Sequence, residues 1–302
     1  MKTKRILALL LLFSLLAGTA CAQEEENAPL PFGDFSEPFS DYFLPAGAEP
    51  IREELFYNSE DIYVKITPIR EQKTDIYVAD IYVRSTENFQ RAFSNDKWKS
   101  PAQKVQEMAE SHNAVIGMTG DNGHNLKTGW VVGNGRVWRD TRSLKRDACI
   151  VYRNGVMQTV EYENLKSIPM EEKLAANEIW HCFLFGPALL DGEGKAKTKF
   201  NSNVGPANPR SAMGYYEPGH YCFVQVDGRG AESKLEEGEK STGLTLTQLS
   251  AFMEGLGCRA AYNLDGGQSS MMYFNGGVIS SPYNNGRKTG DIVLIREVEK
   301  EE

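Results

Sequence analysis

The residues best suited to chemistry lie in one short stretch, Tyr262 to Ser270, which reads YNLDGGQSS. The carboxylate of Asp265 precedes two glycines, and the hydroxyls of Ser269 and Ser270 follow them. Apolar runs on both sides predict a sharp turn between two strands. Glycines let a backbone approach a ligand closely, and a strand end on a rigid scaffold holds polar side chains in fixed directions. Because Asp-Gly is also a common hairpin turn, the stretch alone leaves a structural role and a binding role open.

Two helix–strand units each lead to an aspartate. A capping pattern that begins at Ser100 is followed by a helical pattern, a short apolar run and Asp121, 21 positions after the cap. The same order begins at Thr245 and reaches Asp265 after 20 positions. If both apolar runs enter one sheet in the same direction, the two aspartates emerge at one edge and supply a pair of carboxylates to one cleft. The alternative is a coincidence between two ordinary helix–strand units, because short matches often mislead.

Oxygen-bearing side chains near these turns raise the question of a metal. Asp121, Asn122 and Asp265 carry the oxygen ligands that a hard cation such as Ca²⁺ prefers. The chain contains no Asp-x-Asp-x-Asp-Gly run, so Ca²⁺ stays unassigned, and the sequence requires no cofactor. The amide of Asn263 can brace the Asp265 turn through a local hydrogen bond or contact a ligand.

Alternating apolar and polar residues mark most of the chain as half-buried strands. Examples are the runs 62–66, 76–83 and 221–226, separated by glycine-containing turns such as Asn134-Gly135 and Asp227-Gly228. The helical pattern after Thr245 has a capping box with Gln248 and an apolar stripe. Many strands and few helices predict an α+β fold, a single domain over residues 51–302 with a mixed, mostly antiparallel sheet and a few packed helices.

The amino-terminal segment predicts export. Residues 1–22 combine a basic start, an apolar centre and small residues at the end, which is typical of a signal peptide. Residues 16–21 also resemble a bacterial lipobox. In that case Cys21 would carry a lipid, and this lipid would be the only attachment to a membrane. Residues 23–50 are acidic and contain proline and glycine, so they predict a linker or a loosely docked arm.

Charge and cysteine usage narrow the partners. Removal of the three basic residues in the signal segment changes the formal net charge from −8 to −11, which argues against nucleic acid as a partner. Four further cysteines do not match a zinc-binding pattern. They form either one or two disulfides in an exported protein or four small buried apolar groups. These cysteines are Cys149, Cys182, Cys222 and Cys258.

A family resemblance extends over about residues 60–296. The run 263–272, which reads NLDGGQSSMM, resembles the signature of the phosphodiester glycosidase family. Four further segments, in the same order along the chain, are similar to family segments. They are AVIGMTGDN at 114–122, FGPALL at 185–190, NPRSAMG at 208–214 and STGLTL at 241–246.

The resemblance implies an enzyme and assigns roles to residues. It implies an exported hydrolase that cleaves a glycosyl-1-phosphodiester bond in a cell-surface or extracellular polysaccharide or glycoconjugate. Asp265 and Asp121 would be the paired carboxylates that such chemistry uses, and Arg210 would hold the phosphate through its guanidinium fork. The remaining substrate-binding residues would be Ser269, Ser270, Asn263, Gly266, Gly267, Asn122 and Arg287.

Departures from the family pattern leave an alternative. The early loop lacks the more usual Asn-Gly-Gly-x-Phe, and Gln268 stands where the family has a third glycine. A bulky amide there narrows the approach to the turn or contacts the ligand. The same fold could therefore serve a non-catalytic carbohydrate-binding protein or a protein of envelope or exopolysaccharide assembly.

Overall fold

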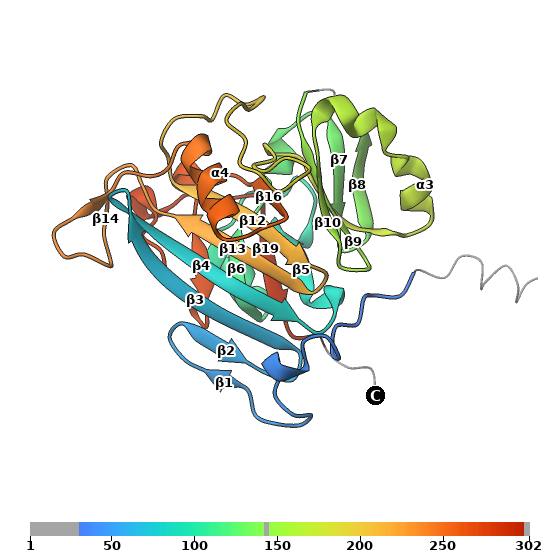
Figure 1. Ribbon diagram of the computed structural model, residues 1–302, viewed down its shortest axis with the longest axis horizontal. Helices are drawn as coiled ribbons and strands as arrows, with labels where there is room; N and C mark the ends of the chain where they lie inside the picture. The colour runs from blue at the N-terminus through green and yellow to red at the C-terminus, as the bar shows by residue number, and fades with distance from the viewer. Residues whose placement is uncertain (1–29, 142–144, 299–302) are drawn as a thin grey trace, which may run out of the picture.

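The computed structural model describes residues 30–141 and 145–298, and its centre is a seven-stranded sheet (Figure 1). The predicted runs 62–66, 76–83 and 221–226 all lie in strands of this sheet. Its strands, in spatial order, are β1 (Ile51–Arg52), β2 (Phe56–Asn58), β3 (Ile62–Glu71), β4 (Thr74–Val83), β13 (His220–Val226), β12 (Arg210–Glu217) and β16 (Ala260–Asn263).

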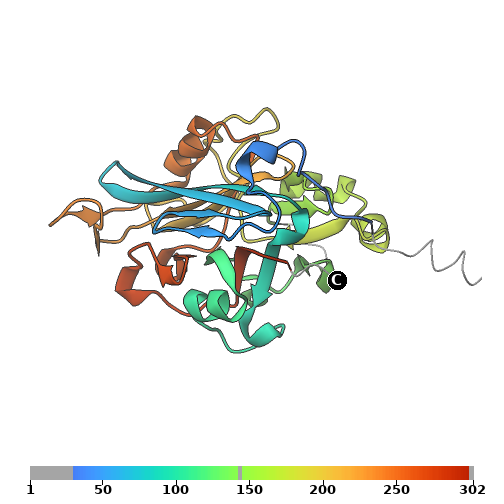
Figure 2. The same ribbon diagram turned by 90° about the horizontal axis from the view of Figure 1, so that it is seen from below.

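A five-stranded sheet packs against one face of the seven-stranded sheet, and Figure 2 shows the two as separate layers. Buried side chains of both sheets, among them Ile66, Phe223, Ile116 and Val293, form the core between them. In spatial order its strands are β18 (Gly277–Val278), β17 (Met272–Phe274), β6 (Ala114–Thr119), β19 (Asp291–Arg296) and β5 (Phe89–Phe93).

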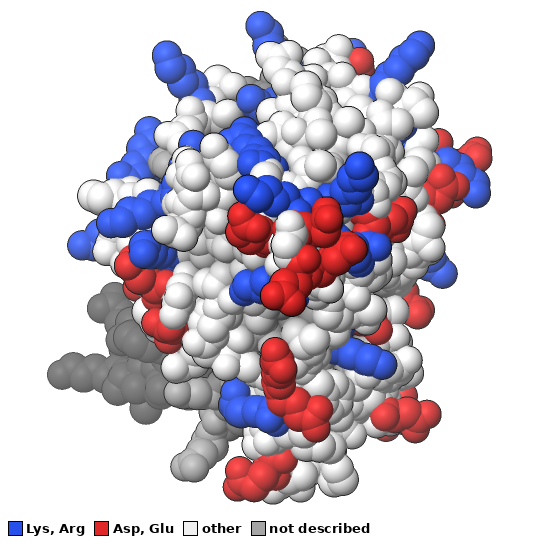
Figure 3. Space-filling view, turned by 90° about the vertical axis from the view of Figure 1, so that its left-hand side faces the viewer, with Lys and Arg blue, Asp and Glu red and all other residues white. Residues whose placement is uncertain are grey.

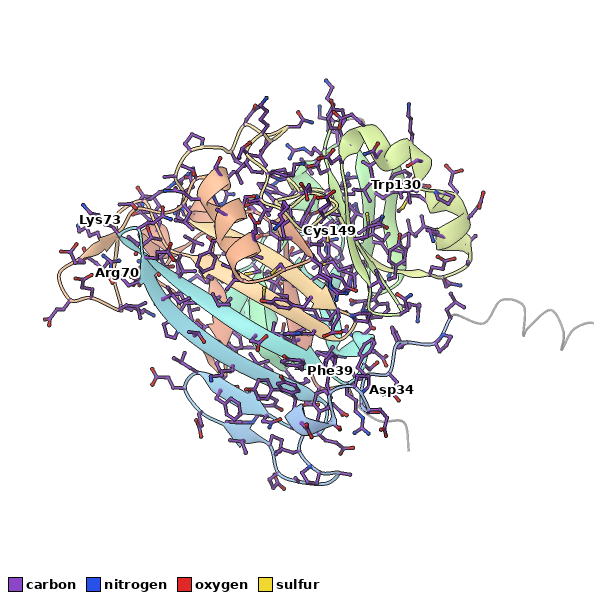
Figure 4. The ribbon with its side chains drawn as sticks, in the orientation of Figure 1. Asp34, Phe39, Arg70, Lys73, Trp130 and Cys149 are labelled. Carbon is purple, nitrogen blue, oxygen red and sulfur yellow. The ribbon has the colours of Figure 1, made fainter. Side chains whose placement is uncertain are left out.

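A second five-stranded sheet lies beside these layers and forms the green region of Figure 1. Its core contains Trp130, and Cys149 on its strand β9 faces the central core (Figure 4). Its strands, in spatial order, are β10 (Met157–Val160), β9 (Ala148–Tyr152), β11 (Ile179–Phe183), β7 (Gly129–Gly133) and β8 (Arg136–Thr141). The short strands β14 (Ala231–Glu232) and β15 (Lys240–Ser241) pair in an arm of their own.

Three α-helices within the described residues cover the sheets. Helix α4 (Leu246–Gly255) packs on the outer face of the seven-stranded sheet through Leu249 and Met253, and α2 (Val105–Ser111) covers the five-stranded sheet that contains β6. Helix α3 (Met170–Ala175) packs beside the third sheet. Short 3₁₀ turns are η1 (Ser40–Tyr42), η2 (Thr86–Asn88), η3 (Ser94–Asp96), η4 (Gly123–Asn125), η5 (Tyr162–Ser167), η6 (Gly267–Ser269) and η7 (Tyr283–Asn285).

The fold is mostly β, with few helices, and agrees with the predicted class except for the mixed sheet. Every strand pairing in the described part of the chain is antiparallel. None of the helices within residues 30–141 and 145–298 is long and apolar enough to cross a membrane. The predicted signal segment, including Cys21, lies outside the described residues. The four later cysteines are free and buried, as the second alternative predicts.

The two helix–strand units are only partly as predicted. Thr245 caps α4 and forms the capping box with Gln248. The helix predicted from Ser100 begins instead at Val105, because the backbone of Gln103 pairs with Thr289 (N···O 2.8 and 3.1 Å) and Glu107 caps the helix at Lys104. Strands β6 and β16 belong to different sheets, so the expectation of a shared sheet is wrong.

Residues 30–50 form a docked arm. Phe35 and Phe39 are buried, and the Phe39 ring packs edge-on against Tyr82 of β4, with ring centroids 5.0 Å apart. Figure 4 shows Asp34 and Phe39 at the lower end of the seven-stranded sheet. Apolar burial holds this part of the segment against the domain.

Candidate functional site

A cavity of about 370 Å³ opens where β12 begins and β16 ends. Five segments that are separate in the sequence meet there, and Asp265 is its one acidic side chain among the described residues. The lining residues are Phe185, Asn203, Val204, Pro206, Asn208, Arg210, Arg229, Asp265, Gly266, Gly267 and Arg287. We call this cavity the cleft.

Asp265 lies at the floor of the cleft, two residues after β16 ends. A backbone hydrogen bond from Asp265 N to Gly120 O (3.0 Å) holds the turn in place. One carboxylate oxygen accepts a hydrogen bond from Gly266 N (3.0 Å), and the other lies 3.2 Å from Nη2 of Arg287. Burial raises the pKa of Asp265, while contacts with Ser269 and Arg287 oppose that rise. Only 5 % of the residue is exposed, so the carboxylate is both sheltered and turned to the cavity.

The two glycines after Asp265 are required by close backbone contacts. A Cβ atom at Gly266 would lie 2.7 Å from Pro209 O, and Gly267 N donates to the same oxygen (2.9 Å). Gly267 has φ +64°, a conformation that other residues adopt at a cost. A Cβ there would also approach Nη2 of Arg229 to 3.1 Å. The glycine pair therefore lets an arginine side chain pass directly over the turn.

Arg229 and Arg287 both line the cleft, so they place positive charge beside the Asp265 turn. Nε of Arg287 donates to Ser269 Oγ (2.6 Å), and half of its side chain (51 %) is exposed. Nε of Arg229 donates to Asn208 Oδ1 (2.8 Å). These contacts orient both guanidinium groups and leave further N–H donors, so the pair can hold an anion in two or more hydrogen bonds.

Arg210 also lines the cleft, but much of its guanidinium is already committed. Its Nε donates to Leu244 O (3.0 Å), and its Nη2 donates to Val204 O (2.6 Å) and Pro206 O (2.6 Å). Burial and the charge of Arg229 lower its pKa to about 10. Arg210 thus holds the wall of the cleft in place, and less of it is free for a ligand than the sequence suggests.

Three of the predicted binding residues support the turn from behind. Ser269 contacts Arg287, as described above. The Ser270 hydroxyl lies 3.0 Å from Ser211 Oγ and accepts from Gln225 Nε2 (2.9 Å), in a buried network outside the cleft lining. Nδ2 of Asn263 donates to Gly186 O (2.8 Å) and Leu264 O (2.9 Å), so Asn263 braces the turn, one of its two predicted roles.

Asp121 is brought near the Asp265 turn but is not part of the cleft lining. It is completely buried, and its carboxylate accepts from Leu184 N (2.8 and 2.9 Å) and Phe185 N (2.5 Å). The guanidinium of Arg91 lies 3.5 Å away. Burial raises the pKa of Asp121 to about 7, opposed first by Arg91. The prediction that Asp121 faces the same cleft as Asp265 is therefore wrong, because its oxygens are used to hold the backbone that carries Phe185.

Asn122 likewise lies outside the cleft lining. Its backbone N–H donates to Asp291 Oδ1 (2.9 Å), and its side-chain oxygen accepts from Asn125. Asp121, one of the oxygen-bearing residues for which Ca²⁺ was left unassigned, is not placed to bind a cation, because its carboxylate oxygens accept hydrogen bonds from backbone N–H groups. The part of the chain that the structure describes holds no group of three or more His, Cys, Asp or Glu side chains arranged to bind a metal.

Sequence reasoning missed Arg229, Asn208 and Phe185 as cleft residues. Arg229 follows β13 in the run Asp227-Gly228-Arg229-Gly230, a turn at the end of a predicted strand. The turn itself could be predicted from these residues. No neighbouring residue indicates that the Arg229 side chain lies over a glycine pair almost 40 residues later in the sequence.

Comparisons with known proteins point to one family. The model of the phosphodiester glycosidase family (NAGPA) matches residues 109–296, more than half of the chain. This stretch contains Asp265, Arg210, Arg229 and Arg287. A search of curated proteins found no match.

Solved structures show the same fold at low sequence identity. The catalytic domain of zebrafish N-acetylglucosamine-1-phosphodiester alpha-N-acetylglucosaminidase, auto-inhibited by its pro-peptide, matches with TM-score 0.59 and 16 % identity over 85 % of this chain and 86 % of that one. A hypothetical protein from Synechocystis has TM-score 0.58 and 14 % identity, with coverages of 83 % and 65 %. A putative exported protein from Burkholderia pseudomallei has TM-score 0.50 and 12 % identity, with 74 % of each chain covered.

Proposed function

Since the chain belongs to the phosphodiester glycosidase family, we propose that it hydrolyses a glycosyl-1-phosphodiester bond and that Asp265 carries the reaction. The observation that supports this most is the cleft itself. It holds one sheltered carboxylate, with the guanidinium groups of Arg229 and Arg287 beside it. Such a site can bind a phosphodiester and place a carboxylate next to the sugar carbon that is attacked.

The two arginines would hold the phosphate. A phosphodiester carries one negative charge on two free oxygens, and guanidinium forks match this geometry. The 3.2 Å contact with Arg287 favours the ionised form of Asp265 and so opposes the rise in its pKa that burial causes. Arg210 fixes the cleft wall beside them through its bonds to backbone carbonyls. Binding energy from the phosphate would thus position the anomeric carbon over the Asp265 turn.

One carboxylate is sufficient for this reaction. Many glycosidases need a second carboxyl group to protonate a departing alcohol. Here the leaving group is a phosphate monoester, which is a weakly basic anion, and the arginines stabilise the charge that develops on it. The absence of Asp121 from the cleft lining is therefore compatible with hydrolysis. Asp265 acts either as the nucleophile at the anomeric carbon or as the base that deprotonates water.

These two roles give different products. Attack by Asp265 forms a glycosyl ester and retains the anomeric configuration after hydrolysis, whereas direct attack by water inverts it. Proton NMR of the first anomer released separates them. The same sample tests the function itself: purified protein is incubated with a methyl diester of a sugar 1-phosphate, and free reducing sugar is measured. Release of sugar together with methyl phosphate is expected.

Binding without hydrolysis would instead support the non-catalytic alternative, a carbohydrate-binding or envelope-assembly protein. Gln268, which stands where the family has glycine, is the feature that favours this alternative. Isothermal titration with sugar 1-phosphate, run beside the hydrolysis assay, distinguishes a binding protein from a protein that does not recognise the ligand.

We further propose that the substrate belongs to cell-surface or extracellular polysaccharide or glycoconjugate. The support is the export signal predicted in residues 1–22. Cell fractionation of the tagged full-length chain, with and without Cys21→Ala, tests export and lipid attachment together. Release of the variant from the membrane fraction would support the lipidated form.

A further inference from the structure

Two of the four free, buried cysteines lie against each other. Sγ of Cys222, in β13, is 3.7 Å from Sγ of Cys258, which follows the C-terminal end of α4. The two residues are 36 positions apart in the sequence. The contact therefore joins the end of α4 to a strand in the interior of the seven-stranded sheet.

This contact crosses the strand β12, which lies between β13 and β16. Gly214 of β12 pairs with Cys222 on one side and with Ala261 of β16 on the other. A Cβ atom at Gly214 would lie 2.5 Å from Sγ of Cys222 and 2.6 Å from Sγ of Cys258. The glycine thus leaves the space in which the two sulfurs meet, and a larger residue there would push them apart.

The other two described cysteines are close in the sheet but do not face each other. In the pairing of β9 with β11, Cys149 is opposite Phe183 and Cys182 is opposite Ile150. The two cysteines are therefore one residue out of register, and successive side chains of a strand point to opposite faces of a sheet. Cys149 accordingly packs in the central core and Cys182 in the core of the third sheet. Of the four described cysteines, only Cys222 and Cys258 are placed to bond.

The surroundings of the pair favour Cys258 as the reactive sulfur. Hydrogen bonding with the Cys222 thiol lowers the pKa of Cys258; burial opposes this effect, and hydrogen bonds with the Tyr216 hydroxyl and the Tyr215 backbone add to it. The same contact with Cys258 raises the pKa of Cys222. Because the thiolate and not the thiol attacks a disulfide, Cys258 is the sulfur that reacts first.

We propose that Cys222 and Cys258 form a disulfide bond as the chain folds under oxidising conditions, such as those it would meet after export. The oxidant is the disulfide of an exchange partner, for example oxidised glutathione. The Cys258 thiolate attacks one sulfur of that disulfide and releases the first thiolate of the partner. Cys222 then loses its proton and attacks Sγ of Cys258, which releases the second. The two cysteines lose two electrons and two protons, and the partner is reduced to two thiols.

The bond forms during folding, because folding buries both sulfurs. Cys222 is completely buried and Cys258 is 3 % exposed. They lie in the apolar core between α4 and the sheet, together with Leu249 and Met253. Charged side chains project instead from the surface, as Figure 3 shows for one face of the molecule. A charged oxidant such as oxidised glutathione therefore reaches the pair before α4 packs onto the sheet, and the same burial then protects the bond from reductants.

The bond also secures the approach to the cleft. Cys258 is followed closely by β16, and the end of β16 leads to Asp265. Strand β16 is the last strand of its sheet and pairs with β12. A covalent link from Cys258 to β13 ties the start of this last strand to the interior of the sheet.

Peptide mapping of the full chain tests the bond directly. The parent protein for this test carries Cys21→Ala, so that four cysteines remain. It is reduced and unfolded in urea, refolded by dilution into a mixture of oxidised and reduced glutathione, and alkylated with N-ethylmaleimide after denaturation. We expect a disulfide to join the tryptic peptides 211–229 and 241–259, with Cys149 and Cys182 alkylated. Alkylation of all four cysteines, or a bond that includes Cys149 or Cys182, would overturn the proposal.

Matched variants measure what the bond contributes to stability. The thermal midpoint is compared after refolding in the glutathione mixture and after refolding in dithiothreitol. The parent should lose roughly 5–15 °C in dithiothreitol, because a link across 36 residues restricts the unfolded chain. Cys258→Ala should show no difference between the two conditions. Cys182→Ala, which removes another buried cysteine, should keep the difference of the parent.

This test is independent of the proposed hydrolysis, because neither the peptide map nor the thermal midpoint requires a substrate. Equal differences in the parent and in Cys258→Ala would show that the redox effect comes from elsewhere and would overturn the proposal. A protein that forms the bond but hydrolyses no diester would leave this inference standing and reject the proposed function.

Discussion

The turn at Asp121 and the turn at Asp265 share a layout but differ in what surrounds the carboxylate. Each follows a helix and a strand, and a hydrogen bond from Asp265 N to Gly120 O joins the two turns. The Asp121 carboxylate is enclosed by the backbone N–H groups of Leu184 and Phe185. The Asp265 carboxylate meets one local N–H and one half-exposed arginine, and it opens onto the cleft.

This difference shows how a carboxylate becomes structural or reactive. When fixed N–H donors occupy both oxygens, the group stabilises the chain and cannot reach a substrate. When a glycine pair lets the chain turn away, as Gly266 and Gly267 do, an oxygen stays accessible. The Asp121 turn also contributes to the site, because it holds Phe185 at the cleft wall. The Asp121 turn therefore shapes the site, and we propose that Asp265, in the other turn, carries out the reaction.

Replacing Asp265, the carboxylate that opens onto the cleft, should have the largest effect. Asp265→Asn keeps the shape of the side chain but removes its charge and its basicity. We expect kcat to fall by about 10²–10⁴-fold, the usual contribution of a positioned acid–base group. Thermal unfolding should change little, because the turn is held mainly by backbone bonds. Reducing-sugar release and circular dichroism measure the two quantities, and full activity in the variant would assign the role to another residue.

The two cleft arginines should show a smaller effect. Arg287→Lys and Arg229→Lys keep the charge but lose the bidentate fork. Each is expected to raise KM, and the inhibition constant of inorganic phosphate, by roughly tenfold, which corresponds to about 1.4 kcal/mol.

Arg210→Lys is the control for this pair. Its main loss should be thermal stability, because Nη2 of Arg210 donates to the carbonyls of Val204 and Pro206. If Arg210→Lys alone weakened phosphate inhibition, the anion-holding role would return to Arg210, as the sequence first suggested.

Asp121→Asn should act on stability more than on chemistry. The amide would turn an N–H group toward donors such as Leu184 N, and one buried donor left without an acceptor costs about 1–3 kcal/mol. Urea denaturation measures this loss. Activity per folded molecule should fall by less than about tenfold. An unchanged unfolding midpoint would show that the carboxylate does not hold the 184–185 backbone in the way its hydrogen bonds indicate.

The smallest expected effect is a shift in the pH profile. Burial raises the pKa of Asp265 above its ordinary value. The ionised form is the active one, so kcat/KM should fall as the pH drops through that raised pKa. Arg287→Gln removes a charge that favours ionisation, so its acidic limb should move to higher pH. A shift to lower pH would mean that a different group controls this limb.

Patterns among neighbouring residues were sufficient to predict part of the structure. The capping box at Thr245, the strands of the central sheet and the Asp265 turn could all be predicted, because each depends on neighbouring residues. The start of α2 could not, since Gln103 pairs with Thr289 across the chain. The role of Asp121 depends on backbone donors about 60 residues away.

Arg229 shows the same limit within the site. Its contacts with Asn208 and Gly267 join segments that are separate in sequence. Its position became clear only with the fold. Conversely, the motif at 263–272 predicted the centre of the cleft, because two adjacent glycines indicate a place where another backbone segment approaches closely.

The most direct test of the central claim is a parallel measurement of kcat/KM for Asp265→Asn and Asp121→Asn. Both are assayed with the methyl diester at a temperature where circular dichroism shows each variant folded. Our expectation is that only Asp265→Asn loses hydrolysis, by about 10²–10⁴-fold, while Asp121→Asn stays within about tenfold of wild type. Equal losses in the two folded variants, or wild-type activity in Asp265→Asn, would contradict it.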